Sequence, residues 1–251
     1  MRNALILLLL SVWLPGSAKA QEITVAAAAD LQFAMQDIVA GFQKQTGQHV
    51  NVVYGSSGNF YEQIQSGAPF DLFFSANLDY AKKLESSGLA DPGTLYPYAT
   101  GKIVLWVVSG SQVNLQPGMR AVLDPAIHKL AIANPQHAPY GQAAVAALRK
   151  EGLYDQITGK LVLGENISQA ASFALSGSAD AGIIALSLAL SPNLKDKGSY
   201  IEVPAADYPP IEQACVALAK SRNKPAAQAF LEFVKTPTAK DILRKYGFGV
   251  N

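Results

Sequence analysis

The stretch that organises the chain is Tyr54-Gly55-Ser56-Ser57-Gly58-Asn59, in which small polar residues join a predicted strand to a predicted helix. The preceding Val50-Asn51-Val52-Val53 is β-branched and alternating, and Phe60 and Ile64 afterwards have the spacing of one helix face. A strand-to-helix junction leaves the first helical N–H groups unpaired at the positive end of the helix dipole. The stretch therefore predicts a seat for an anion. Taken alone, it is more typical of a helix simply capped by Ser57 or Asn59, and the anion seat is favoured only because similar junctions recur along the chain.

Strand and helix patterns alternate along the rest of the chain, which is typical of an α/β fold with parallel strands. Near-continuous apolar runs such as Asp71-Leu72-Phe73-Phe74-Ser75 indicate strands that are buried on both faces. The predicted strands are 21–29, 50–53, 71–75, 101–108, 130–133, 161–163, 181–185 and 214–218. The chain is predicted to close with two helices, at 225–234 and 239–246.

The alternating strands and helices form two successive α/β units along the chain. Two units in a chain of this length predict two lobes of about 100 residues each. We expect lobe 1 to comprise residues 21–104 and 217–251, and lobe 2 to comprise residues 105–216. The strands at 102–108 and 214–218 are expected to cross between the lobes. Ligands of open α/β sheets bind beyond the carboxyl ends of the strands, so a cleft between the lobes is the expected site.

The first 20 residues have the pattern of a signal peptide. Arg2 gives a positive start, an apolar run extends from Ala4 to Leu14, and Ala18-Lys19-Ala20 fits a cleavage site after Ala20. Removal of this segment leaves 18 basic and 19 acidic side chains, a balance unlike that of a nucleic-acid-binding protein. We expect a soluble periplasmic protein that contains one buried thiol, Cys215, and no disulfide.

The patterns of enzymes are weak in this sequence. His49, His128 and His137 lack metal-ligand spacing, and His137 is expected to be a solvated loop residue. Gly55-Ser56-Ser57-Gly58 is not a nucleophile elbow, and no phosphate-binding or dinucleotide-binding fingerprint occurs. A secreted hydrolase that uses Ser56 or Ser57 remains an alternative, although no base stands at a recognisable spacing.

A binding function is favoured because four junctions offer hydrogen-bond donors. These are Ala29-Asp30, Ser56-Ser57, Tyr140-Gly141 and Asn166-Ile167-Ser168. These junctions carry small, amide and hydroxyl side chains and no Lys or Arg. This suggests an oxyanion that is held by dipoles and not by cationic side chains. Asp30 is expected to cap the helix that begins at Leu31, with its carboxylate turned away from the anion.

These motifs resemble those of the periplasmic molybdate-binding proteins of molybdate ABC transporters. The resemblance covers nearly the whole mature chain, and its clearest segments are Ile23-Thr24-Val25, Gly55-Ser56-Ser57, Gly67-Ala68-Pro69, Gly182-Ile183 and Tyr246-Gly247-Phe248. It implies a two-lobed periplasmic binding protein fold of type II and no enzymatic activity. It also implies capture of molybdate or tungstate, which is a ligand and not a cofactor, for a permease in the inner membrane. The protein is expected to be a monomer with no bare metal cation, and sulfate or phosphate is the alternative ligand.

The resemblance implies oxyanion contacts at Asp30, Ser57, Tyr140 and Ile167, and less firmly at Ala29, Ser56 and Ala185. Two positions depart from the family pattern, because Asp30 stands where a serine is usual and Ala185 where a tyrosine is frequent. The hydroxyl of Tyr140 is expected to replace the one that is missing at Ala185.

Overall fold

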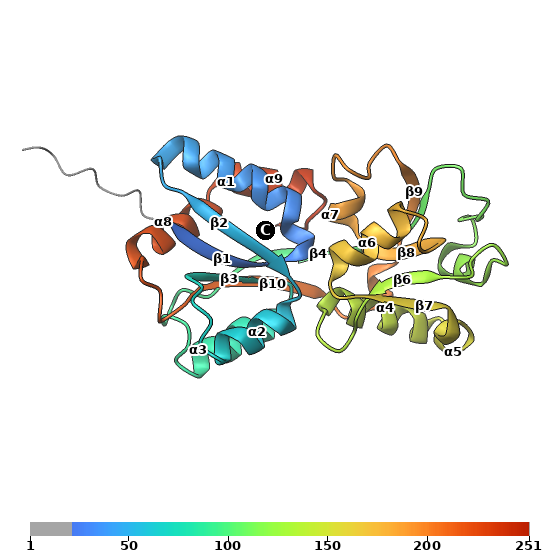
Figure 1. Ribbon diagram of the computed structural model, residues 1–251, viewed down its shortest axis with the longest axis horizontal. Helices are drawn as coiled ribbons and strands as arrows, with labels where there is room; N and C mark the ends of the chain where they lie inside the picture. Colours follow the sequence, from blue (N-terminus) through green and yellow to red (C-terminus); the bar gives the residue numbers. More distant parts are fainter. Residues whose placement is uncertain (1–21, 251) are drawn as a thin grey trace, which may run out of the picture.

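The computed structural model describes residues 22–250, which form two lobes side by side (Figure 1). The predicted signal peptide, with its cleavage site after Ala20, lies outside the described residues. Within residues 22–250 no helix is both long enough and apolar enough to cross a membrane.

The first lobe is built on a five-stranded sheet in the order β2-β1-β3-β10-β4. Its strands are β1 (Ile23–Ala28), β2 (Val50–Gly55), β3 (Leu72–Ser75), β4 (Tyr96–Gly101) and β10 (Ile211–Ala217). Strand β1 is parallel to β2 and β3, and β10 is antiparallel to β3 and β4. The apolar strands β1 and β3 lie inside the sheet and are almost wholly buried, as their sequences predicted.

Helices cover both faces of this sheet. They are α1 (Gln32–Thr46), α2 (Ser57–Gln65), α3 (Leu78–Ser86), α8 (Lys224–Val234) and α9 (Pro237–Lys245). Phe42 of α1 and Phe230 of α8 meet edge to face at 5.0 Å in the core on one side. Phe60 of α2 and Leu84 of α3 belong to the core on the other side. The predicted return of the two closing helices to the first lobe is confirmed.

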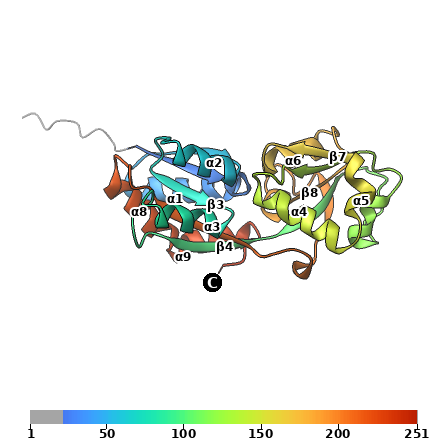
Figure 2. The same cartoon turned by 90° about the horizontal axis from the view of Figure 1, so that it is seen from below.

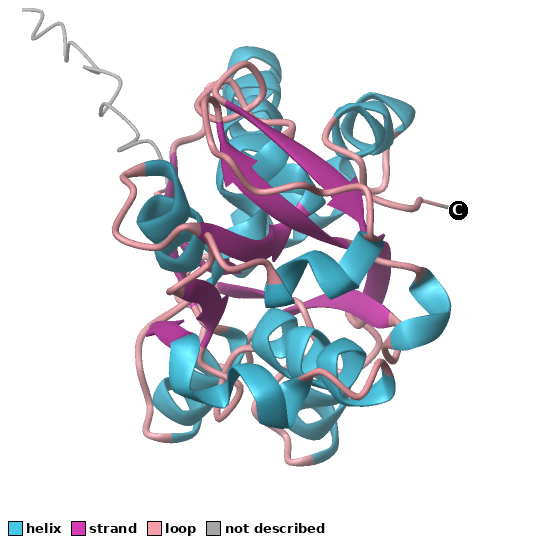
Figure 3. Cartoon of the chain, turned by 90° about the vertical axis from the view of Figure 1, so that its right-hand side faces the viewer, coloured by secondary structure: helices cyan, strands magenta, loops and turns pink. Residues whose placement is uncertain are grey.

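The second lobe has a sheet in the order β7-β6-β8-β5-β9. Its strands are β5 (Ile103–Val108), β6 (Leu130–Ala133), β7 (Leu161–Gly164), β8 (Ala181–Ala185) and β9 (Gly198–Glu202). Its helices are α4 (Pro139–Lys150), α5 (Tyr154–Ile157), α6 (Ile167–Leu175) and α7 (Leu186–Ala189), with the short 3-10 helices η2 (Gly118–Leu123), η3 (Thr158–Lys160) and η4 (Ala205–Asp207). One further 3-10 helix, η1 (Ala29–Leu31), belongs to the first lobe and joins β1 to α1. Viewed end-on, the helices surround the strands (Figure 3).

The chain crosses between the sheets at Lys102 and again between β9 and β10 (Figure 2). The prediction that strands 102–108 and 214–218 themselves cross is wrong, because β5 pairs only in the second sheet and β10 only in the first. An apolar run marks a strand but not its partners, which are distant in sequence. We therefore place residues 22–101 and 211–250 in lobe 1 and residues 103–208 in lobe 2, which shifts both predicted boundaries.

The carboxyl ends of the parallel strands of both lobes point toward the interface between them. Strands β1 and β2 run into η1 and α2, and β6 and β7 lead to α4 and α6. The starts of helices from both lobes therefore meet at one place, as expected for an open α/β fold.

Candidate functional site

A small cavity lies where these helix starts meet, and four strand-to-helix junctions form its wall. Its lining residues are Ala28, Ala29, Asp30, Gly55, Ser56, Ser57, Ala76, Ala138, Pro139, Tyr140, Asn166 and Ile167. The space open to the centre of a water molecule is about 10 Å³, so the cavity has room for roughly one water molecule. Of the predicted site residues, only Ala185 is not part of the wall.

The sequence at each junction explains why a helix starts there with free N–H groups. Ser56 is extended and α2 begins at Ser57. Pro139 opens α4, a position where proline has the right backbone angle and needs no hydrogen-bond partner. Asn166 caps α6 by accepting a hydrogen bond from the Gln169 N–H at 3.1 Å. The N–H groups of Ser57, Tyr140 and Ile167 donate to no acceptor within residues 22–250.

Ser57 adds a side-chain donor to these backbone groups. Its Oγ accepts a hydrogen bond from the Ala76 N–H at 2.9 Å, and the residue is only 1% exposed. The hydroxyl hydrogen of Ser57 has no acceptor among the described residues, although Ser57 lines the cavity. This hydrogen is therefore free to bind a ligand oxygen.

Asp30 does not cap a helix, so that prediction is wrong. Asp30 lies inside η1, whose N-cap residue is Ala28, and α1 begins only at Gln32 with Leu31 as its N-cap residue. Instead Oδ2 accepts from the Tyr140 hydroxyl at 2.8 Å and from Gln213 Nε2 at 2.7 Å, and Oδ1 has no partner within the described residues.

The environment of Asp30 makes its carboxyl easier to protonate than an exposed aspartate. Burial raises the pKa of the carboxyl from 3.8 to about 6, against the lowering effect of the hydrogen bonds from Gln213 and Tyr140. The backbone N–H groups of Asp30 and Leu31 also lower this pKa, by less than the two side chains do. No cationic side chain contributes to the pKa.

Tyr140 belongs to the same buried network, which the sequence analysis missed in part. Its hydroxyl donates to Asp30 and accepts from Gln213 Nε2 at 2.9 Å, while the hydroxyl of Tyr98 donates to Gln213 Oε1 at 2.7 Å. Burial raises the pKa of Tyr140 and of Tyr98 well above 10. Gly101 makes room for the network, because a Cβ there would lie 2.1 Å from the Tyr140 hydroxyl oxygen.

The expected exchange of a hydroxyl between Tyr140 and Ala185 is wrong. The one hydroxyl hydrogen of Tyr140 is already donated to Asp30. Ala185 ends β8, is fully buried and does not line the cavity. The short helix after it contributes Ser187 instead, whose Oγ donates to the backbone oxygen of Asp30 at 2.8 Å.

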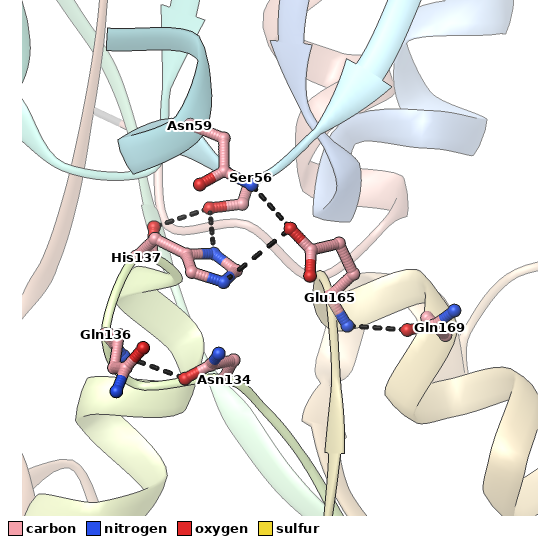
Figure 4. Close-up of polar contacts among 7 residues, drawn as sticks. All are labelled: Ser56, Asn59, Asn134, Gln136, His137, Glu165 and Gln169. Atoms are coloured by element: carbon pink, nitrogen blue, oxygen red, sulfur yellow. Dashed lines mark hydrogen bonds and ion pairs between the residues drawn. The ribbon is translucent and has the colours of Figure 1, made fainter. Parts of the chain in front are cut away.

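A second polar cluster, which we call the interlobe latch, joins the lobes beside the cavity and consists of Ser56, Asn59, His137 and Glu165 (Figure 4). Ser56 Oγ donates to the His137 carbonyl at 2.5 Å and lies 2.9 Å from His137 Nδ1. Asn59 Nδ2 donates to Glu165 Oε1 at 2.6 Å, and His137 Nε2 lies 3.7 Å from the same oxygen.

The latch changes two predictions. The side chain of His137 is only 16% exposed, so it is a contact residue between the lobes and not a solvated loop residue. The Ser56 hydroxyl is directed at His137 and not at the cavity. Sequence spacing gave no sign of this pairing, because the two residues are 81 positions apart.

The cavity wall contains no lysine or arginine, and Asp30 is its one charged side chain. Within residues 22–250 no group of three His, Cys, Asp or Glu side chains could hold a metal ion. The wall therefore offers hydrogen-bond donors and helix dipoles, which suit an oxyanion more than a cation.

Comparison with known proteins gives one consistent result. The profile of a family described as bacterial extracellular solute-binding protein matches residues 23–249. The chain is 42% identical over 235 residues to the molybdate-binding protein ModA of Azotobacter vinelandii, covering 93% of this chain and 92% of that protein. It is also 42% identical over 231 residues to the molybdate-binding protein ModA of Rhodobacter capsulatus, covering 92% and 89%.

The solved structure of the Azotobacter vinelandii periplasmic molybdate-binding protein superimposes with a TM-score of 0.86 at 35% identity. The match covers 91% of this chain and 99% of that one. The predicted two-lobed α/β fold of type II is thereby confirmed.

Proposed function

The chain belongs to the bacterial extracellular solute-binding proteins, and within them to the molybdate-binding ModA family, and on this premise we propose that it captures molybdate for an ABC transporter. Tungstate has the same charge and tetrahedral shape and is proposed as a second ligand. The protein is a periplasmic binding protein and not an enzyme.

The observation that carries the proposal is the wall of neutral donors around the cavity. Helix starts from both lobes direct free N–H groups to one point, and Ser57 adds a free hydroxyl hydrogen. A tetrahedral oxyanion between the lobes would accept from both at once, which would hold the lobes together. Ten of the twelve wall residues are buried, so we propose that the lobes separate to admit an anion to the cavity.

We propose a specific set of contacts within the wall. The donors are the hydroxyl and N–H of Ser57, the N–H groups of Tyr140 and Ile167, and backbone N–H groups at Ala29 and Asp30. Ser56 would contribute backbone alone, since its hydroxyl belongs to the interlobe latch. Ala185 is left out of the set because it does not line the cavity.

The geometry supports neither serine of the hydrolase alternative, and within the described residues Ser57 Oγ meets only the Ala76 N–H and no base. The Ser56 hydroxyl hydrogen is donated to the backbone oxygen of His137, so the nearby imidazole does not receive it as a general base would. Sulfate and phosphate remain the competing ligands, because both are tetrahedral and accept hydrogen bonds in the same way.

Membership in the family implies a permease in the membrane as the partner. We propose that the protein acts as a monomer and that the signal peptide is removed after Ala20. The two lobes, once closed on the anion, would be the form that the permease recognises.

Thermal unfolding of the mature chain with a panel of anions tests the proposed ligand. Molybdate and tungstate at a hundredfold excess over the dissociation constant should add about 2.7 kcal/mol of stability, which corresponds to roughly 5–10 °C for a chain of this size. Sulfate and phosphate at the same concentration should produce no shift, because a rigid ring of donors leaves some unpaired around a smaller ion. If sulfate raised the unfolding temperature as much as molybdate does, or phosphate raised it more, the assignment of molybdate as the ligand would be wrong.

A further inference from the structure

We propose that Asp30 takes up a proton from solvent when a fully deprotonated oxyanion binds, and then donates a hydrogen bond to that anion. Asp30 would thereby couple ligand capture to pH and set which protonation state of an oxyanion is accepted. The inference rests on the proposed function of the cavity as an oxyanion site.

The geometry leaves one oxygen of Asp30 for this purpose. The residue lines the cavity and is 1% exposed, and while Oδ2 receives two hydrogen bonds, Oδ1 receives none within the described residues. A buried carboxyl oxygen without a partner is costly to keep charged. Protonation would turn it into a donor on a residue that lines the cavity, where an acceptor would arrive.

The groups that face Asp30 supply no positive charge. Tyr140 from α4 and Gln213 from β10 donate to its carboxylate, and Ser187 from α7 donates to its backbone oxygen. Tyr98 from β4 is electrostatically coupled to Asp30 and reaches it through Gln213. Both tyrosines are neutral at physiological pH, so no cation offsets a second negative charge beside Asp30.

The charges decide which form of Asp30 can coexist with the ligand. If Asp30 stayed ionised, its repulsion of a −2 anion about 4 Å away would weaken binding of that anion about a millionfold, even at an effective dielectric near 20. Protonating Asp30 first costs only about tenfold at pH 7, since its pKa in the closed protein is already about 6. Proton uptake is therefore the far less costly route.

The proton also distinguishes the candidate ligands. Molybdate carries no proton near neutral pH, so the carboxyl must obtain one from solvent. Hydrogen phosphate carries its own and would donate it to the Asp30 carboxylate, with no net uptake. The number of protons absorbed per anion bound thus reports both the role of Asp30 and the nature of the ligand.

The test is titration calorimetry of molybdate into the full mature chain near pH 8, in Tris and in HEPES, which differ in ionisation enthalpy. Every histidine is retained in Asp30→Asn, so loss of the uptake in that variant assigns the proton to Asp30 and not to a histidine. We expect about one proton per molybdate for the parent protein and none for Asp30→Asn. The matched control Asp37→Asn, which removes a carboxylate from the outer surface of α1, should keep the uptake of about one proton.

The pH dependence of the parent protein gives a second readout that does not depend on the variant's folding. Its association constant for molybdate should fall about tenfold per pH unit between pH 7 and pH 9, whereas Asp30→Asn should give a flat profile. Molybdate binding with no proton uptake and no pH slope would overturn the inference and leave the proposed function standing. Tight phosphate binding without uptake would make Asp30 an acceptor and overturn both, as would a failure of molybdate to bind at all.

Discussion

Ser56 and Ser57 are adjacent and chemically identical, yet their hydroxyls have different tasks. Ser56 precedes the helix in an extended conformation, and its hydroxyl reaches the other lobe at His137. Ser57 is the first residue of α2, and its oxygen receives the Ala76 N–H, which leaves its hydrogen for the cavity. The change from extended backbone at Ser56 to helical backbone at Ser57 therefore directs one hydroxyl to the other lobe and leaves the other for a ligand.

The variant Ser57→Ala should weaken molybdate binding roughly ten- to a hundredfold. A hydrogen bond to a charged acceptor contributes about 1.5–3 kcal/mol, which corresponds to that loss in affinity. Titration calorimetry measures it, with Ser172→Ala on the exposed side of α6 as the matched control. Unchanged affinity in Ser57→Ala would show that this hydroxyl serves only to accept from Ala76.

Asp30→Asn should change how the free energy of unfolding depends on pH. The folded pKa of about 6 lies above 3.8, so the stability that the neutral carboxyl provides is complete below pH 3.8 and is lost as pH rises through 6. The shift is worth about 3 kcal/mol. Denaturant unfolding of both proteins should therefore favour the variant by roughly 2.5 kcal/mol more at pH 7.5 than near pH 4. A difference that does not vary with pH would mean that Asp30 is ionised at no cost.

At the scale of elements, the first turn of α2 approaches the loop between β6 and α4 very closely. The Gly58 N–H donates to the His137 carbonyl at 2.9 Å. A Cβ on Gly58 would lie 2.5 Å from that same backbone oxygen, a distance at which something must move. Glycine at this position therefore serves the closure of the lobes and not the conformation of the helix, since its φ is helical.

Gly58→Ala should keep the protein folded and prevent it from closing. Alanine favours a helix over glycine by up to about 1 kcal/mol, so α2 itself should not suffer. We expect molybdate affinity to fall at least tenfold, and small-angle X-ray scattering to show no compaction when molybdate is added. Gly159→Ala, where a Cβ meets nothing within 4 Å, is the matched control and should behave like the parent. Compaction of Gly58→Ala with the anion would contradict the role given to this glycine.

On the scale of the whole molecule, the single cysteine reports on global opening. Cys215 is 0% exposed in β10, which lies between β3 and β4 in the sheet of lobe 1. Burial raises the pKa of its thiol far above the ordinary range, so the thiolate hardly forms in the folded state. A thiol reagent can therefore reach it only after the sheet opens.

Labelling of Cys215 by such a reagent should be slow and should become slower with ligand. If opening is global, molybdate at a hundredfold excess over its dissociation constant should reduce the rate about a hundredfold. Absorbance of the released chromophore measures the rate, and sulfate at the same concentration should leave it unchanged. A labelling rate that is the same with and without molybdate would mean that β10 opens locally, without separation of the two lobes.

The sequence could predict most elements because their signals are local. The apolar runs of β1 and β3 and the helical spacing of α2 depend on residues close together in the chain. Strands β4 and β9 were not predicted, and both are edge strands of their sheets. Strand β4 contains Pro97, which an edge strand tolerates because its N–H side can be left unpaired.

Sequence alone also determined where helix N-termini follow strands, and thereby which junctions approach the cavity. Only the tertiary structure decided what the side chains there contact. Asp30 is 110 positions from Tyr140 and 183 from Gln213, and Ser56 is 81 from His137. A helix start is fixed by the conformation of its own few residues, whereas the partner of a buried carboxyl is fixed by which distant groups packing brings within 3 Å.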